Sequence, residues 1–377
     1  MPHHGRLGLY VHVPFCSRRC GYCSFSTGPF ARDRAARYVG ALRAEIAQVA
    51  RAPWTGAVAI ETVFFGGGTP SLLEVDEMAA ILADLRGAFA LAAGAEITAE
   101  CNPESASPGR LAGFRAAGVN RISLGVQSLD DAVLATLDRL HSAAEARAAF
   151  DAARAAGFDN VSVDLMYGLP GLAGGTWESS VRGVLAWGPE HLSAYGLTLD
   201  EGSRWHATGV SGLPAEEQVT DQYWRLAGLA AAAGFEHYEI SNYARPGRRS
   251  AHNQIYWRHG EYLALGPAAC GFLGDVRYAN TRSVDRYGAL LERGDSPIDF
   301  DEVLTPRQRL AERLVLGLRL RDGVPSSWID ERIALEPRRL PGVLADFVSE
   351  GLVAVDDRVR LTEAGFLLSD ALFVELL

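Results

Sequence analysis

Along the first 240 residues, short runs of apolar residues alternate with longer segments whose apolar residues recur every three or four positions. The short runs are typical of buried strands, and the longer segments are typical of amphipathic helices. In residues 35–50, for example, Val39, Leu42, Ile46 and Val49 fall at helical spacing. The predicted strands are 7–13, 60–65, 96–101, 119–125, 160–167 and 191–198. The predicted helices between them are 35–50, 78–89, 108–117, segments up to residue 156, and 177–187.

Six strands that each lead into a helix predict a parallel sheet with right-handed crossovers. In a (β/α) barrel the C-terminal ends of such strands share one face, where active sites are built. Because there are six units, we expect the barrel to be incomplete and open on one side, with room for a large ligand. The predicted fold is therefore α/β: an incomplete (β/α)6 TIM-like barrel over residues 1–240 with a small C-terminal winged-helix-like domain.

The last part of the chain has a separate character. Residues 306–320, 325–333 and 340–351 are predicted helices, and 352–361 is a predicted small hairpin. Three helices and a wing indicate a winged-helix-like module over 301–377, preceded by a connector over 241–300. Its charges are of mixed sign, so DNA binding is not expected. We expect this module to close the open side of the barrel.

The end of the first strand carries Cys16, Cys20 and Cys23 in a C-x3-C-x2-C loop. A closed zinc site needs four ligands, and so does an iron–sulfur cube held wholly by protein. Three thiolates on one short loop therefore suggest a metal centre with one open position. The alternative is a zinc knuckle completed by Cys101 or His12.

The other strands also end in polar residues or glycines. Gly67, Gly68 and Thr69 follow the second strand, and Glu100, Gln127 and Asp164 lie near the ends of the third, fourth and fifth. Taken singly, a glycine run is more often a tight turn, and each polar residue could be a helix cap. Parallel strands, however, would gather all of them at one mouth.

Bulk composition narrows the classes of function. With 36 basic and 46 acidic residues, the net charge of −10 argues against nucleic acid or another polyanion bound by charge alone. No apolar stretch approaches the roughly 20 residues of a membrane span, and residues 1–8 lack an apolar signal core. We expect a cytoplasmic protein, with transient membrane association left open. Five cysteines are too few for a disulfide framework, so thiols are available as ligands.

The cysteine loop, with Tyr22 before its last cysteine, resembles that of the radical S-adenosylmethionine (SAM) superfamily. In that family three thiolates hold three irons of a [4Fe–4S] cluster, and the methionine moiety of SAM chelates the fourth. The resemblance implies both cofactors, and an electron donor such as a flavodoxin or ferredoxin if SAM is cleaved. It implies cluster ligation by Cys16, Cys20 and Cys23, and SAM binding by Tyr10, Tyr22, Gly67, Gly68, Thr69, Glu100, Gln127, Arg139 and Asp164.

Within the superfamily the chain resembles the coproporphyrinogen dehydrogenase group, most closely its HemW-type haem chaperones, over nearly its full length. The motifs on which this resemblance rests include Tyr10-Val-His-Val-Pro-Phe-Cys, Arg121-Ile-Ser-Leu-Gly-Val-Gln-Ser and His252-Asn-Gln-Ile-Tyr-Trp. The last resembles the H-N-x-x-Y-W motif associated with haem binding, which implies haem as a ligand of His252, Tyr256 and Trp257. A neutral imidazole is a good axial ligand for haem iron, and aromatic faces suit a porphyrin.

The resemblance leaves three functions open. One is a haem chaperone that transfers haem to an acceptor protein; another is an oxygen-independent coproporphyrinogen III oxidase. The third is a plain iron–sulfur protein whose porphyrin site has decayed. The similar oxidases carry a fourth cysteine where this chain has Phe25, and a longer N-terminal extension than the nine residues before Tyr10. Both differences favour the chaperone and make dehydrogenase activity unexpected.

One position departs from the similar chains. Cys270 stands where they frequently carry a histidine, in the segment Leu265-Gly-Pro-Ala-Ala-Cys-Gly. Cys270 could be a thiolate ligand, or a small buried cysteine that only packs.

Overall fold

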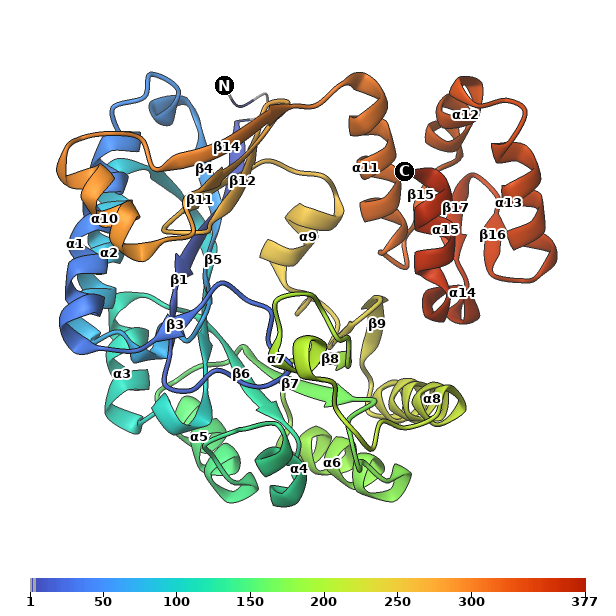
Figure 1. The fold of residues 1–377 in the computed structure, drawn as a ribbon, viewed down its shortest axis with the longest axis horizontal. Coiled ribbons are helices and arrows are strands. Elements are labelled where there is room, and N and C mark those ends of the chain that lie inside the picture. The colour runs from blue at the N-terminus through green and yellow to red at the C-terminus, as the bar shows by residue number, and fades with distance from the viewer. Residues whose placement is uncertain (1, 3–4) are drawn as a thin grey trace.

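The six predicted strands are all present, side by side and parallel, at the centre of the larger part of the molecule (Figure 1). The structure is a computed structural model and describes Pro2 and residues 5–377. The strands are β1 (Arg6–Val13), β4 (Ala59–Gly67), β5 (Ala90–Cys101), β6 (Arg121–Gln127), β7 (Val161–Tyr167) and β8 (His191–Gly196). The predicted incomplete α/β barrel is therefore confirmed.

Helices cover the outer side of the curved sheet (Figure 1). Their apolar stripes face the strands, as in the first helix, where Leu42 and Ile46 are almost fully buried. These helices are α1 (Arg32–Val49), α2 (Val75–Ala88), α3 (Pro108–Ala117), α4 (Asp131–Thr136), α5 (Ala143–Ala155), α6 (Gly174–Trp187) and α8 (Glu216–Ala232). The short helix α7 (Arg204–Thr208) instead contacts the cysteine loop, where the backbone N–H of Trp205 donates to the Gly21 carbonyl.

The sheet is wider than the sequence predicted, with twelve strands in the described part of the chain. Beyond β8 lie the antiparallel strands β10 (Asn242–Ala244) and β9 (Glu236–Glu239). At the other end, β11 (Tyr262–Leu265) pairs in parallel with β1 after the short helix α9 (Ala251–Trp257). Three antiparallel strands and a helix follow: β12 (Cys270–Leu273), β13 (Val276–Asn280), α10 (Val284–Glu292) and β14 (Ile298–Val303).

The C-terminal domain has a hydrophobic cluster of its own around Leu314 and Leu318. The predicted helices are α11 (Pro306–Leu318), α12 (Ser326–Leu335) and α13 (Leu340–Ser349), and the predicted hairpin is β16 (Val353–Val355) with β17 (Arg358–Leu361). Three elements were not predicted: β15 (Val324–Pro325), which pairs with β17, α14 (Glu363–Leu367) and α15 (Ser369–Leu376).

Helix α11 spans the gap between the two ends of the curved sheet (Figure 1). Glu312 on α11 pairs with Arg277 on β13 at 2.7 Å. Just past the helix, Arg319 pairs with Glu239 on β9 at 3.5 Å, and Leu320 forms a β-bridge with Glu239. The C-terminal domain therefore closes the open side, as expected. No helix of the described residues is long and apolar enough to cross a membrane.

Candidate cofactor site and adjoining cavity

The cysteine loop is anchored at its base and at its tip. At the base, β2 (Phe15–Cys16) pairs with β3 (Gly28–Pro29). At the tip, the Gly21 N–H donates to Asp138 at 3.1 Å, and the Trp205 N–H donates to the Gly21 carbonyl at 2.9 Å. A Cβ atom at Gly21 would lie 2.3 Å from the Trp205 indole nitrogen, so this close approach requires glycine.

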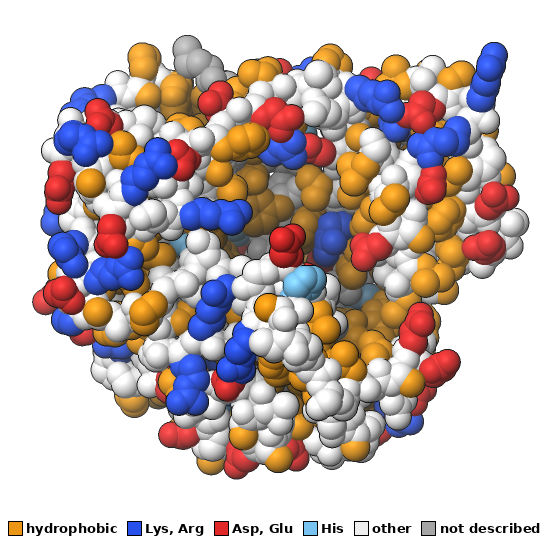
Figure 2. Space-filling model, in the orientation of Figure 1, with side chains coloured by type: hydrophobic (Ala, Val, Ile, Leu, Met, Phe, Trp, Pro, Cys, Tyr) orange, Lys and Arg blue, Asp and Glu red, His pale blue; other side chains and the backbone are white. Residues whose placement is uncertain are grey.

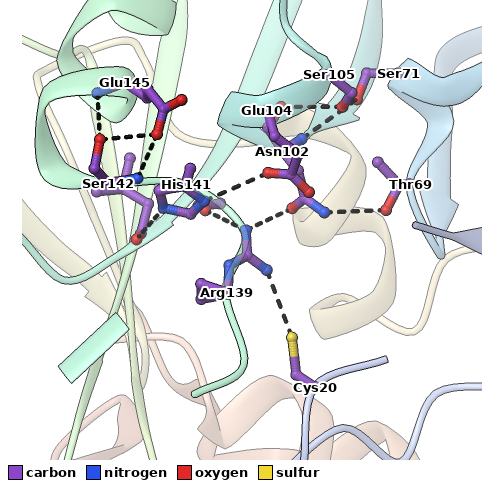
Figure 3. Close-up of polar contacts among 12 residues, drawn as sticks. Cys20, Thr69, Ser71, Asn102, Glu104, Ser105, Arg139, His141, Ser142 and Glu145 are labelled. Carbon is purple, nitrogen blue, oxygen red and sulfur yellow. Dashed lines mark hydrogen bonds and ion pairs between the residues drawn. The ribbon is translucent and has the colours of Figure 1, made fainter. Parts of the chain in front are cut away.

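All three loop thiols are free and line one cavity of about 350 Å³ at the C-terminal ends of the parallel strands. We call it the cluster cavity. The Thr69 hydroxyl donates to Cys16 Sγ at 3.5 Å. Arg139 Nη1 donates to Cys20 Sγ at 3.9 Å (Figure 3). Burial raises the pKa values of Cys16 and Cys23, and hydrogen-bond donors oppose that rise. Thiolates with such donors fit a [4Fe–4S] cluster, whose sulfurs accept hydrogen bonds.

The structure gives the zinc-knuckle alternative no fourth ligand. Cys101 also lines the cluster cavity, but it is buried and its thiol donates to the Ala99 carbonyl at 3.8 Å. The two ring nitrogens of His12 are already hydrogen-bonded, one to the Tyr10 hydroxyl and one to the Ser26 carbonyl, each at 2.9 Å. The described residues hold no group of three or more His, Cys, Asp or Glu arranged for one metal ion. A [4Fe–4S] cluster does not need such a group, because each thiolate binds a different iron.

The glycine run packs against the cysteine loop as well as lining the cluster cavity. Gly67 has φ +102°, and a Cβ atom there would lie 2.5 Å from the His12 ring. At Gly68 it would lie 2.4 Å from the Phe15 carbonyl oxygen. Glycine is therefore required here for a close approach inside the protein, where the end of β4 contacts His12 on β1 and Phe15 on β2. Thr69, which follows, carries the hydroxyl that reaches Cys16.

Two carboxylates face the cluster cavity: Glu100 from β5 and Asp164 from β7, with β6 between the two strands. The Ser123 hydroxyl donates to Asp164 at 3.2 Å. Lost solvation, together with the nearby Asp164 charge, raises the pKa of Glu100 to about 8. Lost solvation also raises the pKa of Asp164. Two carboxylates on the wall of one cavity fit a ligand that brings hydroxyl and ammonium groups, as SAM does.

Gln127 and Arg139 complete this wall. Gln127 has φ +66° beside an irregular step in the β6–β7 pairing, which turns its side chain into the cavity. Arg139 Nη2 donates to the Asn102 side chain and to the Gly125 carbonyl, both at 2.7 Å. Asn102 also donates to Thr69 at 3.1 Å, so it links the two donors that reach the cysteines (Figure 3). Sequence reasoning missed Asn102, although it directly follows β5.

The two predicted tyrosines separate. Tyr22 lines the cluster cavity and packs against Trp205, with 6.0 Å between ring centroids. Tyr10 instead lines a second, adjoining cavity, and its place beside SAM stays a prediction. Its hydroxyl is hydrogen-bonded to His12 on the same strand at 2.9 Å.

The second cavity has a volume of about 550 Å³ and adjoins the first. We call it the aromatic cavity. It lies between the cysteine loop, α9, β12 and α11, where Figure 2 shows a hollow with hydrophobic side chains at its base. Its aromatic wall comprises Tyr10, Phe25, Tyr256, Trp257, Tyr262 and Phe272. Phe25, Gly67 and Glu100 line both cavities, so they form the partition between them.

The predicted haem motif divides between this cavity and the core. Tyr256 and Trp257 line the aromatic cavity, but His252 is fully buried and lines neither cavity. Its ring nitrogens lie 2.7 Å from the Thr62 hydroxyl and 2.7 Å from the Tyr256 hydroxyl. Burial lowers its pKa to about 3, so the imidazole is neutral. The structure does not bring His252 to a place where it could ligate iron, because both ring nitrogens are engaged.

Cys270 is the opposite case. It is exposed and lines the aromatic cavity, so the interpretation of a small buried cysteine is wrong. It stands first on β12, on a wall that the sequence did not place near Tyr256 and Trp257.

Comparisons with known proteins agree with this geometry. Residues 10–182 match the Radical SAM superfamily, and residues 304–368 match the HemN C-terminal domain. The "Heme chaperone HemW" of Mycobacterium tuberculosis is 40% identical over 98% of this chain and 94% of its own length. That of Bacillus subtilis is 32% identical over 97% of both chains. The solved structure of coproporphyrinogen III oxidase (HemN) from Escherichia coli superimposes with a TM-score of 0.86, at 25% identity over 98% of this chain and 90% of that one.

The similarity to the bacterial chaperones extends along almost the whole chain, and both domains match family descriptions of their own. The radical SAM superfamily implies a [4Fe–4S] cluster and SAM as cofactors. The chain belongs to the radical SAM superfamily and, within it, to the HemW haem chaperone family.

Proposed function

We propose that the protein is a haem chaperone that holds a [4Fe–4S] cluster and SAM in the cluster cavity. It binds haem in the adjoining aromatic cavity and transfers it to an acceptor protein. The observation that carries this proposal is the 550 Å³ cavity, lined by Tyr256 and Trp257, directly beside the cysteine loop. The two bacterial relatives described above, both haem chaperones, support the same function.

The aromatic cavity suits a flat, largely apolar ligand. Its volume falls in the range of small-molecule sites, and apolar walls with a few polar groups are usual for such sites. Aromatic rings offer apolar faces for a porphyrin. If SAM is cleaved in the working cycle, the cluster supplies an electron for radical chemistry and needs a donor such as a flavodoxin or ferredoxin.

The second candidate function is oxygen-independent oxidation of coproporphyrinogen III, which is supported by the structural similarity to HemN. Phe25 favours the chaperone. Its side chain is 62% exposed and stands in the partition between the cavities, where it can pack against a ligand but cannot ligate a metal.

Hemin titration of cluster-loaded protein tests the proposal. We expect a shifted Soret band in wild type and weaker binding in Trp257→Leu, with cluster absorbance unchanged. Trp224→Leu is the matched control, because Trp224 is a partly exposed tryptophan on α8 that lines neither cavity. Equal hemin affinity in the two variants would count against the aromatic cavity.

A second assay separates chaperone from oxidase. The cluster-loaded protein is incubated anaerobically with coproporphyrinogen III, SAM and a reductant. We expect no decarboxylation, whereas sustained conversion to protoporphyrinogen would replace the chaperone with the oxidase.

A further inference from the structure

The aromatic cavity has few side chains that could bind an iron atom. Both ring nitrogens of His12 are taken by Tyr10 and Ser26. The Tyr10 hydroxyl is occupied by the same contact, and the Tyr256 hydroxyl contacts His252. Among the lining nitrogen and sulfur donors, His259 and Cys270 remain.

His259 is turned away from the open space. Its Nε2 lies 3.6 Å from the Glu312 carboxylate and is buried, and the side chain is only 11% exposed. Its ring packs on Phe272, with 4.7 Å between centroids. Reaching an iron in the cavity would require this packing to break.

Two polar atoms of the same wall nevertheless lack hydrogen bonds. His259 Nε2 and Trp257 Nε1 are both buried without a hydrogen bond to any described residue. Buried polar groups are normally satisfied, so the unpaired indole N–H of Trp257 on the cavity wall points to a ligand with an acceptor of its own.

Cys270 is exposed to the cavity and held on a regular strand. It pairs with Ala279 on β13, and its thiol donates only a weak hydrogen bond to the Ala268 carbonyl at 3.7 Å. The sulfur lone pairs remain available. Since β12 is fixed within the large sheet, the sulfur is pre-positioned rather than carried on a mobile loop.

The charge beside Cys270 also suits a cysteine that binds a metal as a thiolate. Burial raises the pKa of the thiol, and the Arg282 guanidinium opposes that rise. Arg282 has no ion-pair partner among the residues that the structure describes, so its charge is available to stabilise a thiolate at Cys270.

We propose that Cys270, not His252, is the side chain that ligates haem iron in this protein; this proposal rests on the proposed function. As the Fe–S bond forms, a water molecule leaves the ferric iron and the thiol proton passes to solvent. No electron is transferred in this step. The phenol ring of Tyr256 and the indole of Trp257 then flank the porphyrin, and His252 acts as a positioning residue that holds Tyr256.

Spectra of the hemin complex test this ligand. Cluster-loaded protein is used, so that the three loop thiols are occupied. We expect wild type to give the electron paramagnetic resonance and ferrous–carbonyl absorption typical of thiolate-ligated haem. Cys270→Ser should lose these signatures, and Cys270→His should replace them with those of imidazole ligation.

Cys270→Ser should also weaken hemin binding at least about tenfold, since even the partners of metal ligands contribute about 10–100-fold. His252→Gln should keep the thiolate signature.

Alkylation gives a second measurement that does not depend on the variants. Iodoacetamide should modify Cys270 in the haem-free, cluster-loaded protein, and hemin should protect it, as followed by mass spectrometry. Wild-type spectra without thiolate character, or an unchanged spectrum in Cys270→Ser, would overturn the assignment while leaving the chaperone function standing. Absence of any Soret shift in wild type would instead remove the haem site itself, and the ligand with it.

Discussion

Glu96 on β5 accepts the backbone N–H of His252 at 3.1 Å, and its other carboxylate oxygen accepts the N–H of Ala251 at 3.1 Å. These bonds satisfy two donors at the start of α9, the helix that carries Tyr256 and Trp257 to the aromatic cavity. Glu100, four residues further along the same strand, faces the cluster cavity. One strand therefore positions parts of both cavities.

Glu96→Gln should destabilise the protein and weaken hemin binding. The amide keeps one acceptor but loses the charge, and hydrogen bonds to charged groups contribute roughly 1.5–3 kcal/mol each. We expect the free energy of unfolding, measured with denaturant, to fall by about 1–2 kcal/mol. Glu61→Gln is the control, because Glu61 forms only a surface pair with Arg6, for which we expect about 0–1 kcal/mol. Equal effects of the two variants would contradict the positioning role.

Cys20→Ala should abolish the cluster. After anaerobic reconstitution, absorbance, electron paramagnetic resonance and iron content should show a [4Fe–4S] cluster in wild type and its loss in this variant. Cys101→Ala should retain the cluster, since the Cys101 thiol is buried and directed at a backbone carbonyl. A cluster signal that survives in Cys20→Ala would sink the assignment.

Glu100→Gln should change how stability depends on pH. The pKa of Glu100 is raised from its ordinary value of 4.5 to about 8, so the folded state holds this proton more tightly than the unfolded chain. Its contribution to stability is present below pH 4.5 and is lost as the pH rises towards 8. Without cofactors, the variant should show a smaller decline in unfolding free energy between pH 6 and pH 8. Parallel curves for wild type and variant would show that Glu100 does not titrate in this window.

Arg319→Leu should loosen the closure by the C-terminal domain. It leaves the Glu239 carboxylate buried without its cation and removes the guanidinium that lies 4.3 Å from the Trp257 ring centroid. Since removing one partner of a buried pair is strongly destabilising, we expect a loss of roughly 2–4 kcal/mol in denaturant unfolding. Arg321→Leu removes the exposed pair with Glu363 and should cost about 0–1 kcal/mol. Adding Glu239→Gln to Arg319→Leu should recover part of the loss; no recovery would argue against the ion pair.

The strand order of the barrel and the cluster cavity were predictable because both depend on short-range patterns. Apolar runs separated by helical periods predict parallel strands, and parallel strands must bring Cys16, Glu100, Gln127 and Asp164 to one face. The aromatic cavity was not predictable in the same way. Its walls come from a parallel pairing of β11 with β1 and from a helix more than 290 residues after Tyr10, and neither pairing has a local signal.

The direction of individual side chains was the other feature that could not be predicted from the sequence. The H-N-x-x-Y-W motif suggested three haem residues, but spacing alone cannot say that His252 turns into the core to meet Thr62. Likewise, the exposure of Cys270 depends on which face of β12 it occupies, and that is set by the pairing with β13.

The partition of Phe25, Gly67 and Glu100 has a thermodynamic consequence. Any ligand that shifts this wall from one side changes the free energy of filling the other side. Thermodynamic linkage then requires symmetry: the factor by which SAM changes the affinity for haem is the factor by which haem changes the affinity for SAM. A change in the dissociation constant of SAM would thus report whether haem is bound in the aromatic cavity.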